Sequence, residues 1–191
     1  MLRLVLSSCI VVGCLSLTAP VTTAQKVIHA LTGTVSSIDP AAKTITAYTD
    51  DRSESLFKDL TNLQKRIEFD KKVRADATAA AAFNRKGAYV IVYYFGDGNV
   101  RTTVGLRSLG SGPFTKSSGT VVKFEEHSIT IKGESGAVDS FKITSDTVAE
   151  TGTGAIEGLK FRPQKGDQVQ VIATASNGSA TALFINAAYA P

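Results

Sequence analysis

The few residues able to carry acid–base or metal chemistry are scattered along the chain. It contains two histidines, His29 and His127, and two cysteines, Cys9 and Cys14. Zinc sites and activated cysteine nucleophiles usually combine a histidine with a cysteine or a second histidine. Neither histidine of this chain has such a residue close by in the sequence. We therefore expect both histidines to be surface residues without a catalytic role.

The acidic residues and glycines form no catalytic motif. Adjacent carboxylates occur at Asp50-Asp51 and Glu125-Glu126, in predicted turns, where acidic side chains commonly bind backbone amides and water. The three glycines between Gly152 and Gly158 lack the flanking strand and helix that a dinucleotide-binding loop requires. We predict no catalytic residue, no metal site and no cofactor. A hydrolase with carboxylates in a cleft between two domains is the weaker alternative.

The first 24 residues have the organisation of an export signal. Arg3 precedes an apolar run over residues 4–17, and Thr22-Thr23-Ala24 supplies small residues before a cleavage site. We predict cleavage after Ala24, which removes both cysteines and suits a periplasmic or secreted protein. The alternative is a lipoprotein acylated at Cys14, which ends a lipobox-like Val-Val-Gly-Cys sequence. No later segment has the ~18 consecutive apolar residues of a transmembrane helix, so we predict no transmembrane segment in the mature chain.

The remaining chain contains two halves with the same order of sequence patterns, which we assign to units at residues 25–110 and 114–191. Each half has a Gly-Thr-Val strand start, an alternating strand with Ile-Thr, an x-Phe-Lys segment, a Gly-led strand and a final strand after a Gly/Asn turn. These elements lie at 33–35, 44–46, 56–58, 87–92 and 100–107 in the first half, and at 119–121, 129–131, 140–142, 166–171 and 180–186 in the second. Such a repeat predicts two copies of one fold.

Each half is expected to form a small closed barrel. Strands with period-2 alternation, such as Ser128–Lys132, can bury one face most economically by closing into a barrel without exposed edges. The segment between the third and fourth strands is typical of an OB-type barrel. In the first unit it includes a predicted helix at residues 78–86 that Thr78 would cap, whereas the glycine-rich second connection should be mostly loop. The fold class is therefore mainly β: two tandem five-stranded OB-like barrels with a short helix inserted between strands 3 and 4 of the first.

The pattern of Gly-Thr-Val, turn, Thr-Ile-Thr, Phe-Lys and Gly-Asp-x-Val-x-Val resembles the small β-barrel repeats of exported bacterial proteins, a family of unknown function. The resemblance covers most of residues 117–187 and, more loosely, residues 31–108. The first unit departs from it in its longer connection and in Ala88, which stands where the second unit has Asp167. The resemblance implies the fold and the exported location but no activity.

Basic residues are concentrated in the first unit. Residues 25–112 contain 13 Lys and Arg against 9 Asp and Glu, whereas residues 113–191 contain 7 against 8. A basic patch on an OB-like barrel could hold an anionic glycan, a phospholipid or, less favourably for an exported protein, nucleic acid. A solvated surface is the simpler interpretation, because acidic residues are interleaved with it. The candidate anion-binding residues are Lys65, Arg66, Lys71, Lys72, Arg74, Arg85 and Lys86.

The predicted fourth strand of the first unit carries apolar side chains on both faces. The inward positions are Val90 and Val92 in this unit and Val169 and Val171 in the second. The outward positions in the first unit, our candidate interaction patch, are Tyr89, Ile91, Tyr93 and Phe95. A patch of this kind is rarely left exposed. We expect the 60–86 insert, through Leu63, Ile67 or Phe83, or the second barrel to cover it; a partner protein or a stacked glycan is the alternative.

Together these features favour an exported, non-enzymatic binding or structural module at the bacterial cell envelope. Its partner would be an envelope protein or glycan, which the sequence does not identify. The main rival function is binding of an anionic polymer or surface through the basic insert of the first unit. The sequence leaves the ligand and the oligomeric state open.

Overall fold

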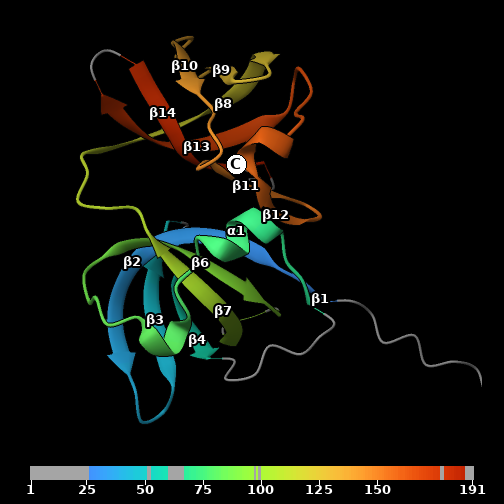
Figure 1. Ribbon diagram of the computed structural model, residues 1–191. Helices are drawn as coiled ribbons and strands as arrows, with labels where there is room; N and C mark the ends of the chain where they lie inside the picture. The colour runs from blue at the N-terminus through green and yellow to red at the C-terminus, as the bar shows by residue number, and fades with distance from the viewer. Residues whose placement is uncertain are drawn as a thin grey trace, which may run out of the picture.

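The computed structural model describes residues 26–50, 53–59, 67–96, 98, 100–176 and 179–187. Figure 1 shows two β-rich units, one above the other, with the chain passing once between them. The first unit contains β1 (Lys26–Val27), β2 (His29–Asp39), β3 (Thr44–Thr49), β4 (Glu54–Asp59), β5 (Ile67–Glu68), α1 (Lys71–Ala75), the 3₁₀ helix η1 (Ala80–Ala82), β6 (Tyr89–Phe95) and β7 (Val100–Ser108). The second contains β8 (Phe114–Glu125), β9 (Ser128–Lys132), β10 (Val138–Lys142), β11 (Val148–Thr151), β12 (Gly154–Glu157), the 3₁₀ helix η2 (Gly158–Lys160), β13 (Gln168–Ser176) and β14 (Ser179–Asn186).

The first unit is a closed five-stranded barrel with the strand order β2-β3-β4-β7-β6. Its neighbours pair in antiparallel fashion except β4 and β7, which run parallel, as the crossover between strands three and five requires. Both α1 and η1 lie in the connection between β4 and β6, where a short helix is expected in an OB-type barrel. The barrel interior is filled by alternating inward residues, among them Val35, Ile45, Phe57, Val90 and Val92.

The strands of the second unit form the same ring. Each strand pairs with the next in the order β8-β9-β10-β14-β13, and β13 pairs with β8 to close the ring. As in the first barrel, the pairing of the third strand with the fifth, β10 with β14, is parallel. The interior contains Val121, Ile129, Phe141, Val169 and Val171. The fold class expected from the sequence is therefore confirmed for both units.

The two barrels also agree in strand register. Gly33 of β2 pairs with Val90 of β6, and Gly119 of β8 pairs with Val169 of β13. A Cβ on Gly33 would lie 2.7 Å from the Tyr48 carbonyl oxygen, and one on Gly119 would lie closer still to a backbone oxygen of the facing strand. Glycine is therefore required at both positions because the first strand bends tightly over the second.

The helix expected at residues 78–86 does not form. Thr78 makes a β-bridge with Leu106 of β7 instead of capping a helix, and only the 3₁₀ turn Ala80–Ala82 follows. The one α-helix described is α1, which Asp70 caps by accepting hydrogen bonds from the amides of Lys72 and Val73. Four alanines provide helix propensity but too few consecutive hydrogen bonds to outweigh pairing with β7.

The connection between β10 and β13 is also more ordered than expected. The glycine-rich segment predicted to be mostly loop contains the antiparallel hairpin of β11 and β12, followed by η2. β11 extends the sheet by pairing in parallel with the end of β14. This hairpin packs against β2 and α1 of the first unit, so it provides much of the interface between the two barrels.

Candidate functional site

The strand registers show which residues occupy equivalent positions in the two barrels. Ile38 of β2 pairs with Ile45 of β3, and Phe124 of β8 pairs with Ile129 of β9. Both are the last pair but one before the turn between the first two strands, and both follow a register shift at the same place in the first strand. Phe124 is therefore the counterpart of Ile38, at the same end of the barrel.

Backbone hydrogen bonds and 3₁₀ turns identify two further counterparts. The last residue of β4 and the residue after β10 each donate their amide to the turn between the first two strands of their barrel, Asp59 to the Lys43 carbonyl and Ile143 to the His127 carbonyl. Each 3₁₀ turn ends at a phenylalanine that enters its barrel core, which matches Phe83 with Phe161 and Ala81 with Leu159.

Three positions thus differ in size or polarity between the two barrels. In the second unit Ile143 is buried, and Phe124 and Leu159 pack against the barrel core, with the Phe124 ring edge-on to Phe161. The first unit has smaller or polar residues at the same places: Ile38, Asp59 and Ala81. The end of the second barrel is closed by apolar side chains that the first barrel lacks.

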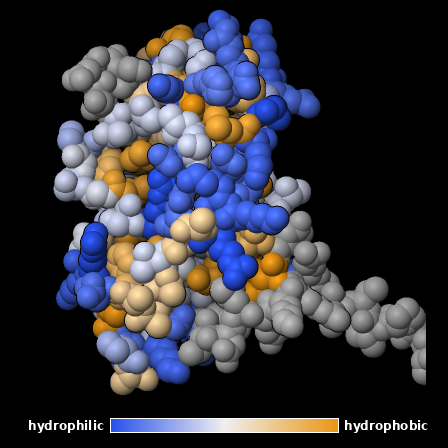
Figure 2. Space-filling view, viewed as in Figure 1, coloured by the Kyte–Doolittle hydropathy of each residue, from blue (hydrophilic) through white to orange (hydrophobic). Residues whose placement is uncertain are grey.

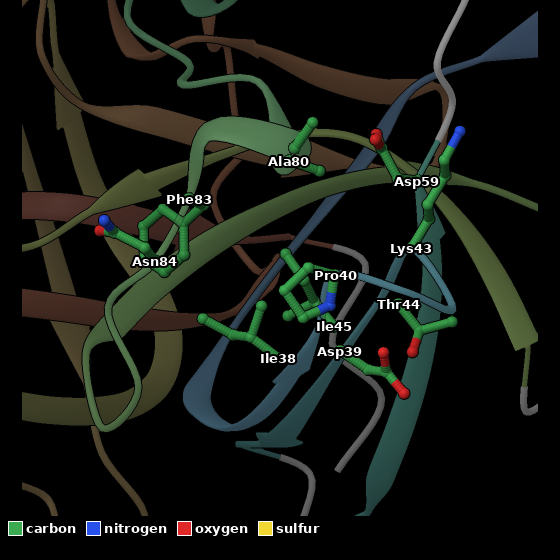
Figure 3. Close-up of a pocket in the computed structure, with 11 residues that line it drawn as sticks. Ile38, Asp39, Pro40, Lys43, Thr44, Ile45, Asp59, Ala80, Phe83 and Asn84 are labelled. Carbon is green, nitrogen blue, oxygen red and sulfur yellow. The ribbon is translucent and has the colours of Figure 1, made fainter.

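The first barrel has a pocket at this end, with a volume of about 230 Å³. Figure 3 shows its apolar residues facing one another across the opening between the β2–β3 turn and the η1 segment. Figure 2 shows a pale hydrophobic patch where η1 reaches the surface. The lining residues are Ile38, Asp39, Pro40, Lys43, Thr44, Ile45, Asp59, Ala80, Ala81, Phe83 and Asn84.

Charged residues surround this apolar pocket. The Asp39 carboxylate accepts hydrogen bonds of 2.9 Å from the amides of Ala41 and Ala42, which fixes the β2–β3 turn. Lys43 follows with a left-handed φ of 53° and ends the turn. Asp59 and Lys43 lie at one side of the pocket in Figure 3. None of the ion pairs between described residues includes Asp39, Lys43 or Asp59, so in the described part of the chain the two carboxylates and the ammonium group at the pocket edge have no charged partner.

The outward face of β6 is buried between the two units. Ile91 and Tyr93 are 0% exposed and belong to a core with residues of α1, β11, β12, β13 and β14. Phe69 packs against Tyr93 with ring centroids 5.3 Å apart, and Phe114 of β8 packs against Tyr89 at 5.2 Å. The expected cover from the insert and the second barrel is confirmed.

The individual covering residues were predicted only in part. Ile67, an expected covering residue, and Phe95, a residue of the candidate interaction patch, both pack at the edge of this core. Phe83 lies inside the first barrel instead, since the turn of η1 directs it inward. Leu63 lies outside the described residues. Among the described residues the Tyr93 hydroxyl is buried without a well-formed hydrogen bond; burial raises its pKa well above the usual range, and the nearby Arg107 guanidinium opposes this shift.

A buried carboxylate links the two units. Glu150 of β11 is 5% exposed and accepts hydrogen bonds of 2.7 Å from the Ala30 amide and from Nδ1 of His29, both in β2. Burial raises the pKa of Glu150, although the hydrogen bonds from His29 and Ala30 oppose the shift. His29 is therefore half-buried and structurally engaged, contrary to the expectation of a plain surface histidine, whereas His127 is exposed in its turn.

Further polar contacts surround this link. Asp50 accepts hydrogen bonds from the hydroxyls of Thr32 and Tyr89, and its carbonyl accepts one from Lys116 of β8. Asp70, the α1 cap, binds the Lys160 ammonium at 2.7 Å. The Lys116–Asp50 and Lys160–Asp70 contacts, like that of Glu150, join groups from both units around the apolar core between them, so the two barrels pack through a specific interface.

The Gly152–Gly158 segment serves this interface rather than a nucleotide. Gly154 has a φ of +119°, and a Cβ there would lie 2.5 Å from the Val27 side chain and 2.9 Å from the Ile28 carbonyl oxygen. The Ala155 amide donates to that carbonyl at 2.7 Å. Glycine is needed because β12 approaches the β1–β2 backbone this closely.

The candidate anion-binding residues do not share one location. Lys71 and Arg74 are exposed on α1, where Figure 2 shows a hydrophilic band along the boundary between the units. Lys72 pairs with Asp76 and Asp146 instead. Arg85 and Lys86 are exposed after η1, which Figure 1 places well away from α1, at the far end of the first barrel. Lys65 and Arg66 lie outside the described residues.

Comparison with protein families and with curated proteins finds no match for this chain. Within the described residues, no group of three or more His, Cys, Asp or Glu side chains is placed to hold a metal ion. None of the described helices is long and apolar enough to cross a membrane. The site must therefore be interpreted from its own geometry.

Sequence reasoning did not find the pocket. Its three distinguishing residues, Ile38, Asp59 and Ala81, are ordinary in type and lie far apart in the sequence. A signal was present in the two halves: with Phe57 aligned on Phe141, Asp59 falls on Ile143, and with Phe83 aligned on Phe161, Ala81 falls on Leu159.

Proposed function

We propose that this protein is an exported, non-enzymatic binding module, and that the pocket at the end of the first barrel is its ligand site. The ligand would place an apolar group among Ile38, Ile45, Ala80 and Phe83. A concave apolar pocket with a few polar groups at its edge is the usual form of a small-molecule site. The second barrel would then have a structural role, since it buries the outer face of β6.

The comparison between the two barrels carries this proposal. In the second unit, Phe124, Ile143 and Leu159 fill the corresponding space with apolar side chains. The fold thus accepts a closed end, and the opening in the first barrel comes from side-chain choice at a few positions. An unfilled apolar pocket forgoes stabilising contacts, which is typical of binding sites.

The proposed periplasmic or secreted location rests on the first 24 residues of the sequence. Cleavage after Ala24 would give a chain that begins at Gln25. The intact mass of the protein recovered from its native host tests this directly. A diacylated species that begins at Cys14 would contradict it and identify a membrane-anchored lipoprotein.

The binding proposal is tested by filling the pocket with the side chains of the second barrel. Ala81→Leu, alone and with Ile38→Phe, should leave the fold intact and abolish binding of benzyl alcohol and benzylamine, measured by amide chemical-shift titration. Ala82→Leu is the matched control, because Ala82 is exposed in the same 3₁₀ turn and does not line the pocket. Failure of the wild-type protein to bind either probe, or equal binding by the filled variant, would refute the proposal.

A further inference from the structure

We propose that the pocket of the first barrel selects a small organic cation, with an apolar body and one protonated amine. This inference rests on the binding function proposed above and specifies the ligand class. The apolar body would occupy the pocket, and the amine would lie at its edge beside Asp59. Asp39, on the neighbouring turn, would add to the attraction.

The charges of the pocket edge favour a cation. The charged residues that line the pocket, Asp39, Asp59 and Lys43, sum to one negative charge, whereas the whole chain has a formal charge of +4. Arg85 and Lys86 follow the lining residue Asn84 but are exposed and do not line the pocket. None of these three takes part in an ion pair among the described residues. A carboxylate at the edge of an apolar space is stabilised by an opposite charge that can also donate a hydrogen bond.

Asp59 is the residue that most distinguishes this edge from the second barrel. Its counterpart Ile143 is 1% exposed and part of the core. Both residues donate the same backbone hydrogen bond to the turn between the first two strands of their barrel, so the backbone geometry does not require a polar side chain there. The carboxylate therefore adds a charge to a position that the fold can fill with an apolar group.

The pocket volume limits the size of the ligand. An apolar cavity of about 150 Å³ in another protein binds benzene. A volume of about 230 Å³ accommodates one ring or a short branched chain together with a substituent that reaches the edge. A nucleotide or an oligosaccharide would extend well beyond this volume, so a single apolar group with one amine is the class that best fits both volume and charge.

Three probes of similar shape and different charge test the inference: benzylamine, benzyl alcohol and benzoate, titrated at pH 7 and constant ionic strength. Amide chemical shifts of residues 80–84 and Ile45 report occupancy of the pocket. We expect benzylamine to bind about five- to tenfold more tightly than benzyl alcohol, and benzoate to bind most weakly, because the ammonium group makes a charge-assisted hydrogen bond.

Asp59→Asn keeps the size of the side chain and removes its charge. It should reduce the preference for benzylamine over benzyl alcohol to about twofold while leaving the affinity for benzyl alcohol unchanged. Glu54→Gln, an exposed charge removal on the same strand that does not line the pocket, is the control and should preserve the preference. Equal binding of the two probes by the wild-type protein, or a preference that survives Asp59→Asn, would overturn the cation inference and leave the pocket function standing. Absence of binding by all three probes would overturn both.

Discussion

Replacing Glu150 by alanine should weaken the junction between the two barrels. The change removes the acceptor for the Ala30 amide and for Nδ1 of His29, each at 2.7 Å. An unsatisfied buried amide costs about 1–3 kcal/mol, and loss of the buried side-chain methylene adds about 0.8 kcal/mol. We therefore expect Glu150→Ala to lower the free energy of unfolding by about 2–4 kcal/mol at pH 7.

The pH dependence of the junction has a definite sign. Burial raises the pKa of Glu150 above its unfolded-state value of 4.5, so the folded chain binds this proton more tightly than the unfolded chain. The resulting stabilisation is complete below pH 4.5 and is lost as the pH rises through the folded-state pKa. Glu150→Gln stays uncharged and can still accept from Ala30. Its stability relative to the wild type should therefore increase with pH over this range and then level off.

Urea unfolding measures both effects, with tyrosine fluorescence as the probe because the chain has five tyrosines and no tryptophan. Glu126→Ala is the matched control, since the Glu126 side chain is 79% exposed in its turn, and it should change stability by less than about 0.5 kcal/mol. Two results would refute the reasoning: an effect of Glu150→Ala no larger than that of the control, or a Glu150→Gln variant that loses stability relative to the wild type as the pH rises.

Three further substitutions test other parts of the structure. Tyr93→Phe removes a buried hydroxyl that makes no well-formed hydrogen bond with the described residues, so thermal unfolding should show unchanged stability or a gain of up to ~1 kcal/mol; a loss above ~1 kcal/mol would reveal a hydrogen bond in solution, for example with Arg107. Gly154→Ala should cost about 2–4 kcal/mol, because its φ is +119° and the new Cβ would lie 2.5 Å from a side chain of β1. Gly152→Ala, in the same hairpin with nothing within 4 Å, should be nearly neutral, and equal effects of the two would contradict this packing. We expect no retention on heparin at physiological ionic strength; retention that weakens in the Lys71→Ala, Arg74→Ala double variant would favour an anionic-polymer function instead.

The strand architecture could be predicted because its signals are local and occur twice. Alternation assigned Val90 and Val92 to the barrel interior, and the alignment assigned Val169 and Val171 to the interior of the second barrel, where the structure places them. Apolar residues on both faces of β6 predicted a cover, since exposing Ile91 and Tyr93 together would be unfavourable. These inferences depend on side-chain alternation and burial alone, which a sequence displays directly.

The short elements between strands could not be predicted in the same way. At Thr78 the sequence signal for a helix cap competes with a β-bridge to Leu106, a residue 28 positions later. Gly152 and Gly154 predict flexibility when considered alone, but Gly154 is required by the close approach of β12 to β1. The Glu150 link joins residues 120 and 121 positions apart. Each outcome is decided by tertiary contacts, which no local pattern contains.

The pocket itself is best understood from what the second barrel does with the same space. Replacing Ala81 by leucine adds apolar carbons at a position where Leu159 packs against the core, and each buried methylene contributes about 0.8 kcal/mol. Filling the first barrel is therefore expected to stabilise it, and it needs no change of backbone. If both barrels had only a structural role, that role would not explain why this space is unfilled. It would also not explain why Asp59 stands where the second barrel has isoleucine. Binding of an apolar, positively charged ligand explains the open space and the carboxylate together.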